Sequence, residues 1–188
     1  MKKFTLFFAL ALSLTGSILA KEKQAMTNKY ETTVLAGGCF WGVEELFKEL
    51  PGVVETNVGY TGGSADTANY HDVSSGETGH AEAVQIVFDP SKISFEKILL
   101  YFFRLHDPTT LNKQENDVGS QYRSAIFYTN EKQKEVALQV KKDISAKWKD
   151  PVVTEIVPLK EFYQAEDYHQ DYLDKNPNGY RCHYLRKE

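Results

Sequence analysis

Cys39 is the side chain of this chain best placed to act as a nucleophile. Two glycines precede it and Phe40 and Trp41 follow it. Apolar residues over 32–36 predict a strand before it, and apolar residues recurring every three or four positions predict a helix that begins beside it. The first N–H groups of a helix favour an anion by roughly 0.3–1 kcal/mol, so we expect the thiol pKa to fall by about one unit. A small buried residue at a strand end is the alternative use of this cysteine.

Glu82 is the candidate proton donor. The pattern over 81–89 predicts a strand with Val84, Ile86 and Phe88 on one face, and Glu82 has the same parity. Burial disfavours the ionised carboxylate and raises its pKa. Remaining protonated at pH 7 requires a rise of about 3 pKa units, or about 4 kcal/mol, and therefore a dry site. A carboxylate at a solvated strand end is the alternative.

Cys182, six residues from the C-terminus, is the second of the two cysteines. A structural disulfide with Cys39 would close a long loop and stabilise the fold by about 5 kcal/mol, which would suit a secreted binding module. A hydrolase that pairs Cys39 with His80, His106 or His169 is a further alternative. A metal site at Cys182 and its neighbouring histidine is disfavoured because the ligands number fewer than four, so no metal is predicted.

Residues 1–20 predict a signal peptide, because two lysines, an apolar run over 4–14 and small residues precede position 21. Cleavage is expected after Ala20, with Ser17 as the alternative site. The expected location is therefore periplasmic or secreted, without stable membrane insertion after cleavage. A retained anchor is the alternative outcome for this segment.

The composition suits one enzyme-sized domain that does not bind nucleic acid. The formal net charge is −4 and falls further when the two lysines of the leader are removed, so no basic excess faces a phosphate backbone. We expect a polar lead-in over 21–30 and a single domain over 31–188, with a tail from about residue 175.

The elements that must hold these side chains predict an α+β fold. Strands are expected over 32–36, 53–60 and 81–89 and before 128, with helices after Cys39 and after Ser94. This order, β-α-β-β-α-β, is typical of a ferredoxin-like two-layer sandwich. An added helix capped by Asn130, a strand over 152–159, a helix over 161–174 and a long coiled C-terminal tail complete the expectation. The glycine-rich loop over 61–80 is long enough to indicate a functional segment.

Five segments together resemble the methionine sulfoxide reductase A family, and they read GGCFWGVE, VGYTGG, TGHAEAV, NDVGSQYRS and NPNGYRC. The resemblance spans about Thr33 to Cys182, nearly all of the expected mature chain. It implies a peptide-methionine (S)-S-oxide reductase acting on the S epimer of methionine sulfoxide, free or in oxidised proteins. It also implies no cofactor beyond an external thioredoxin-like reductant.

The resemblance assigns a role to each matching residue of the oxygen-binding machinery. Cys39 matches the nucleophile that attacks the sulfoxide sulfur, and Glu82 matches the acid that protonates the oxygen. Tyr60 and Tyr122 match the two tyrosines whose hydroxyls bind that oxygen. Asp117 matches the aspartate of the polar network near the nucleophile.

The resemblance also covers the methyl pocket and the second thiol. Phe40 and Trp41 match the aromatic wall that receives the S-methyl group. Attack leaves a sulfenic acid on Cys39, which a second thiol condenses with, and Cys182 is the candidate. Many members carry cysteine directly after the Gly-Tyr of the tail or carry two tail cysteines, whereas here Arg181 intervenes and one cysteine is present. A reductant would therefore attack the Cys39–Cys182 disulfide itself.

Overall fold

The computed structural model describes residues 29–186. The predicted signal peptide over 1–20 and most of the predicted lead-in over 21–30 lie outside them. The chain divides into two compact units, Met1–Glu31 and Thr32–Glu188, and the architecture below is that of the second. Within residues 29–186 no helix has the length and apolar character needed to cross a membrane.

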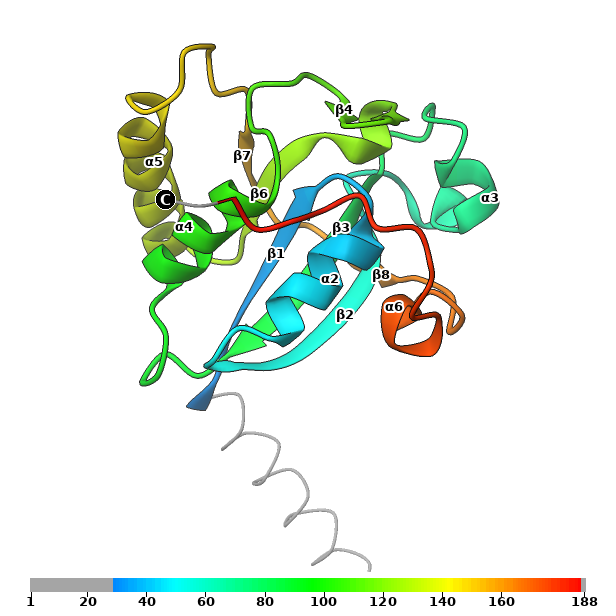
Figure 1. Cartoon of the computed structure of the whole chain (residues 1–188), viewed down its shortest axis with the longest axis horizontal. Helices are drawn as coiled ribbons and strands as arrows, with labels where there is room; N and C mark the ends of the chain where they lie inside the picture. Colours follow the sequence, from blue (N-terminus) through cyan, green and yellow to red (C-terminus); the bar gives the residue numbers. More distant parts are fainter. Residues whose placement is uncertain (1–28, 187–188) are drawn as a thin grey trace, which may run out of the picture. The chain divides into compact units, whose positions relative to one another are not determined.

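A six-stranded mixed sheet organises the fold, with the strand order β7-β6-β1-β3-β2-β8 (Figure 1). Its strands are β1 (Glu31–Gly37), β2 (Val53–Thr61), β3 (Ala81–Phe88), β6 (Ser124–Tyr128), β7 (Glu155–Pro158) and β8 (Phe162–Gln164). β1 pairs antiparallel with β6, and β2 pairs antiparallel with β3 and β8. β7 runs parallel to β6. A separate two-stranded sheet joins β4 (Lys113–Gln114) to β5 (Asp117–Val118).

The larger hydrophobic core lies between one face of this sheet and three helices. From residue 31 to residue 186, the α-helices are α2 (Phe40–Lys48), α3 (Tyr70–Val73), α4 (Phe95–Leu105), α5 (Glu131–Ser145) and α6 (Tyr172–Lys175), and the 3-10 turns are η1 (Ala65–Thr67) and η2 (Ser120–Tyr122). Leu35, Val84 and Ile126 face this core together with apolar residues of α2, α4 and α5. The opposite sheet face carries mostly small side chains such as Ala36 and Ala83. Alternation along each strand therefore decides which residues meet α2.

Several local predictions are confirmed. The Ser94 hydroxyl accepts from the Lys97 N–H at 3.2 Å and caps α4. The Asn130 side chain likewise caps α5 by accepting from the Gln133 N–H at 3.0 Å. The long loop over 61–80 is ordered by η1 and α3.

The helix predicted over 161–174 is wrong. Phe162–Gln164 forms β8 at the edge of the sheet, and only Tyr172–Lys175 is helical. Gly59 explains the difference, since a Cβ there would lie 2.4 Å from the Phe162 ring, so its absence admits this strand. The Gln170 side chain then hydrogen-bonds the Val58 N–H and C=O, both at 2.9 Å, in place of a helical pattern.

The α+β class is confirmed, and the chain order β1-α2-β2-β3-α4-β6 contains the predicted alternation. After α6, residues 176–186 contain no helix or strand. This segment crosses α2 and ends beside α4 (Figure 1), where the Arg186 N–H donates to the Arg104 carbonyl at 3.0 Å. The tail therefore brings Cys182 back to the beginning of α2.

Candidate active site

Cys39 occupies the N-cap of α2, as predicted. Gly38 before it has a φ of +105°, a backbone conformation that favours glycine. The side chain of Cys39 is buried, with 7% of its surface exposed. The next N–H, that of Phe40, donates to Glu82 Oε2 at 3.1 Å, so α2 presents nucleophile and acid together.

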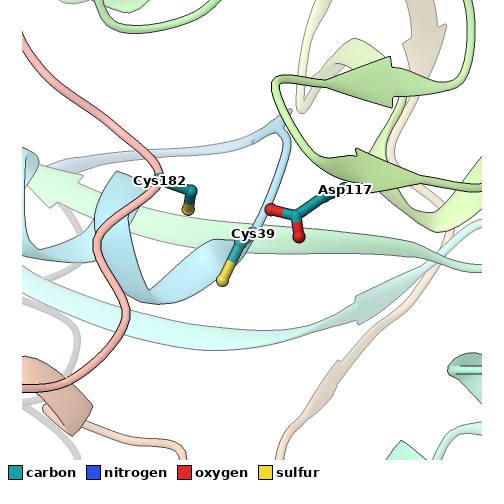
Figure 2. Close-up of side chains that lie close together, drawn as sticks. All are labelled: Cys39, Asp117 and Cys182. Atoms are coloured by element: carbon teal, nitrogen blue, oxygen red, sulfur yellow. The ribbon is translucent and has the colours of Figure 1, made fainter.

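Cys39, Cys182 and Asp117 form one cluster although they lie far apart in the sequence. Their sulfurs and one carboxylate oxygen all lie within 4.8 Å of one another. Figure 2 shows Cys39 beginning α2, Cys182 on the tail and the Asp117 carboxylate directed toward the sulfurs. Both cysteines are free thiols. Within residues 29–186 the cluster offers three donors, whereas a structural zinc site has four protein ligands, and no metal is assigned to it.

The prediction that the pKa of Cys39 falls is wrong, because the contact with Cys182 raises this pKa. The hydrogen bond with Cys182, burial and the nearby Glu82 charge raise the pKa of Cys39 well above its ordinary value. The Trp41 N–H of the helix terminus lowers it, as expected, but by less. The pKa of Cys182 is lowered by the hydrogen bond from Cys39, against burial, and further by His183. Cys39 is therefore the harder of the two thiols to deprotonate.

Glu82 is buried, on the apolar face of the strand that its parity indicated. Only 3% of its surface is exposed, and it lies on the core-facing side of β3 with Val84. Burial raises its pKa to about 8, and the Phe40 N–H opposes this rise. At neutral pH the carboxyl is therefore mostly neutral and able to donate a proton.

Both predicted tyrosines lie near Glu82. Tyr60 pairs with Glu82 across β2 and β3, so the two side chains share one face. The Tyr60 hydroxyl donates to Glu166 Oε2 at 2.8 Å. Tyr122, on η2, has a pKa raised by burial and then by the charges of Glu82 and Asp117. Burial, followed by Glu166, also raises the pKa of Tyr60, so both phenols remain neutral donors at neutral pH.

The predicted aromatic wall is built around a histidine. Phe40 is buried, with its ring centroid 5.1 Å from that of His169. Trp41 stacks on Tyr172 at 3.7 Å, and its indole N–H donates to His169 Nδ1 at 3.0 Å. The ring centroid of Tyr70 lies 4.6 Å from that of His169. Phe40 and Trp41 are therefore held in a fixed aromatic cluster beside the nucleophile.

The histidines offered to the hydrolase alternative are committed elsewhere. His80 contacts the Ser64 carbonyl at 2.9 Å and the Gly63 N–H at 3.2 Å. His106 contacts the Phe102 carbonyl at 2.8 Å and a serine hydroxyl at 2.7 Å, and burial lowers its pKa to about 3. His169 Nδ1 accepts from Trp41. None of these contacts forms a nucleophile–base pair with Cys39.

Sequence reasoning missed three residues of the site. Tyr70 lies in the electrostatic field of Glu82 and Cys39, which together with burial raises its pKa. Glu166 accepts a hydrogen bond from the Tyr60 hydroxyl, and His183 contacts Cys182. The sequence held a signal for one of them, His183, because a glycine inside a predicted helix, here Gly42, indicates close approach of another group.

Comparison with known proteins shows the family to which this chain is similar. A family model described as "Peptide methionine sulfoxide reductase" matches residues 31–188. The chain is 51% identical over 164 residues to "Peptide methionine sulfoxide reductase MsrA" of Pseudomonas fluorescens, covering 86% of this chain and 77% of that protein. The reduced form of Mxr1 from Saccharomyces cerevisiae matches with a TM-score of 0.83 at 39% identity, covering 86% and 94% of the two chains. Mxr1 in complex with Trx2 matches with a TM-score of 0.60 at 28% identity, covering 86% and 93%.

Proposed function

The chain belongs to the peptide methionine sulfoxide reductase family, and we propose that Cys39, Glu82 and Cys182 carry out its reaction. The protein reduces the S epimer of methionine sulfoxide to methionine with a thioredoxin-type reductant. The observation that carries the residue assignment is the contact between two buried thiols beside a protonated carboxyl at the beginning of α2.

In the first step, the Cys39 proton passes to the Cys182 thiolate, and the Cys39 thiolate attacks the sulfoxide sulfur. Glu82 donates its proton to the sulfoxide oxygen, which is a poor leaving group until it is protonated. Cys39 Sγ bonds to the substrate sulfur as the protonated S–O bond breaks, and the hydroxyl then bonds to Cys39 Sγ as the bond between the two sulfurs breaks. Methionine leaves, and Cys39 becomes a sulfenic acid. Two electrons move from the Cys39 sulfur to the substrate sulfur, so the step balances without a cofactor.

Polar and aromatic neighbours hold the substrate for this step. We assign the Tyr60 and Tyr122 hydroxyls to the sulfoxide oxygen and Asp117 to the polar network beside the thiols. Phe40 and Trp41, fixed by His169, are assigned to the S-methyl group, because a methyl is received best by an apolar aromatic surface.

In the second step, Cys182 condenses with the Cys39 sulfenic acid and releases water, leaving a Cys39–Cys182 disulfide. A thioredoxin-type partner then reduces this disulfide, and the similarity to the Mxr1–Trx2 complex supports such a partner. No further cofactor and no metal are proposed. The substrates proposed are free methionine sulfoxide and oxidised proteins, and neither nucleic acid nor a membrane is a proposed partner.

Two finer assignments accompany the reaction. The strand order β6-β1-β3-β2, with α2 and α4 against one sheet face, supports classing the core as ferredoxin-like, and residues 176–186 support a coiled tail.

Residues 1–20 support export to the periplasm or medium. Intact-mass analysis of exported protein tests the second assignment, since a mature chain beginning at Lys21 is expected and an uncut chain would contradict it.

Single-turnover reduction tests the reaction. Reduced protein is mixed with the separated S and R epimers of a blocked methionine sulfoxide, and methionine and free thiols are counted. We expect consumption of the S epimer alone with two thiols lost for each methionine formed. Cys39→Ser should form no methionine. Loss of a single thiol would remove Cys182 from the cycle, and turnover by Cys39→Ser would overturn the assignment of the nucleophile.

A further inference from the structure

His183 lies between the second thiol and the loop that carries the nucleophile. Its Nδ1 is 3.0 Å from Cys182 Sγ, and its Nε2 is 2.7 Å from the Gly37 carbonyl oxygen. Both ring nitrogens are therefore engaged. The imidazole connects the C-terminal tail to the end of β1.

The Gly37 contact fixes which ring nitrogen carries the proton. A carbonyl oxygen only accepts hydrogen bonds, so Nε2 must donate to it. In the neutral imidazole the other nitrogen, Nδ1, then bears a lone pair, and that lone pair faces Cys182 Sγ. His183 is thus oriented to accept the thiol proton.

Two glycines of the Cys39 segment make room for this ring. A Cβ at Gly42 would lie 2.7 Å from His183 Nδ1, and a Cβ at Gly38 would lie 3.0 Å from Nε2. Gly42 is helical and needs no unusual φ, so the close approach of the imidazole is a specific reason for glycine there. Glycines on both sides of the ring, Gly38 and Gly42, therefore allow His183 to approach the beginning of α2.

The titratable and charged groups near the His183 ring are Cys182, Asp117, His106 and Arg186. Burial disfavours the charged imidazolium, but Cys182 on the tail, the Gly37 carbonyl and Asp117 on β5 favour it more, so the pKa of His183 is raised. His106, at the end of α4, is held neutral because burial lowers its pKa to about 3. Arg186, the other cation of this region, hydrogen-bonds the carbonyls of Phe103 and His106.

We propose, resting on the function assigned above, that His183 is the general base that restores the Cys182 thiolate for attack on the Cys39 sulfenic acid. Cys182 needs a base at this stage because the hydrogen bond from the Cys39 thiol, which lowers the pKa of Cys182 in the reduced protein, is lost when Cys39 becomes a sulfenic acid. The Cys182 S–H bond breaks toward His183 Nδ1, the new S–S bond forms as the Cys39 S–O bond breaks, and the proton leaves with the hydroxide as water. Cys182 Sγ supplies the electron pair of the new S–S bond and the hydroxide leaves with the pair of the S–O bond, so the sulfenic acid is itself the oxidant and the step needs no other.

The test separates methionine formation from disulfide formation. Reduced wild-type protein and His183→Gln are each mixed with one equivalent of the S epimer, without reductant, between pH 6 and 9. Methionine, remaining thiols and trapped sulfenic acid are followed in time. His183→Gln keeps an amide N–H for the Gly37 carbonyl, and His71→Gln, an exposed histidine on α3, is the matched control.

We expect His183→Gln to form one equivalent of methionine but to lose its second thiol about 10²-fold or more slowly at pH 7. Its disulfide rate should rise with pH and recover partly with added imidazole. A wild-type disulfide rate in His183→Gln would overturn the proposal. A slow rate that neither pH nor imidazole changes would also overturn it, because that would mark a structural role only. Failure of the wild-type protein to form methionine would instead contradict the reductase assignment.

Discussion

Replacing Glu82 with glutamine should stabilise the protein while removing its acid. Glu82 is buried on the core face of β3, where its Oε2 accepts a hydrogen bond from the Phe40 N–H at 3.1 Å. A glutamine amide oxygen accepts the same bond and never ionises. The wild-type carboxyl, in contrast, must take up a proton to be buried at neutral pH.

The magnitude follows from the pKa of about 8 in the folded chain against an ordinary value of 4.5. Because the folded state binds the proton more tightly than the unfolded state, stability falls as pH rises from about 4.5 and stops falling above about 8. At about 1.4 kcal/mol for each pKa unit, this cost is about 1 kcal/mol at pH 5 and about 4 kcal/mol at pH 8. The burial cost of the glutamine amide is independent of pH. The advantage of Glu82→Gln over wild type should therefore grow by about 3 kcal/mol between these pH values.

Denaturant unfolding of both proteins with their thiols reduced measures this difference directly. Glu77→Gln, an exposed carboxyl on the long loop, is the control and should show no such growth. Methionine formation by Glu82→Gln should fall by about 10²-fold or more, since the amide cannot readily donate a proton. A stability difference that stays constant between pH 5 and pH 8 would refute the argument that Glu82 is buried as a neutral acid.

Three further substitutions test the rest of the site. Gly42→Ala should slow loss of the second thiol at least about tenfold, because the added Cβ displaces the imidazole of His183. The substitution should not cost helix stability, since alanine favours a helix over glycine by about 1 kcal/mol. Loss of the second thiol at the wild-type rate would argue against docking of the tail on α2. Tyr122→Phe should lower the single-turnover rate of methionine formation by about 10²-fold, as for other lost oxyanion donors. Tyr60→Phe should lower this rate by less, because the Tyr60 hydroxyl already donates its hydrogen bond to Glu166. Equal losses in the two variants would contradict that ranking. Cys182→Ser should form one equivalent of methionine and then stall with a thioredoxin-type reductant, whereas sustained turnover would exclude Cys182 as the second thiol.

The sequence predicted the features that depend on local periodicity. Cys39 at a helix N-terminus follows from a strand pattern, a glycine pair and a helix pattern in succession. The burial of Glu82 follows from its parity with the apolar residues of one strand. Neither prediction needed knowledge of which strands are neighbours.

What depends on long-range pairing was beyond the sequence pattern. Tyr60 reaches Glu82 only because β2 and β3 pair in one particular register. Phe162–Gln164 becomes a strand because β2 offers an open edge and Gly59 admits an aromatic ring. The raised pKa of Cys39 depends on the return of Cys182 along a tail without periodic structure. Only the recognised family motifs anticipated that these segments meet.

The coupling between Glu82 and Cys39 makes one protonation state serve both chemical requirements. A charged Glu82 raises the pKa of Cys39, so the Cys39 thiolate forms more readily while Glu82 is neutral. Neutral Glu82 is also the form that donates a proton to the sulfoxide oxygen. Deprotonation of Glu82 above about pH 8 should therefore remove the acid and hinder the nucleophile at once. Burial of this carboxyl, which costs stability at neutral pH, is for that reason the feature that keeps acid and nucleophile in matching states.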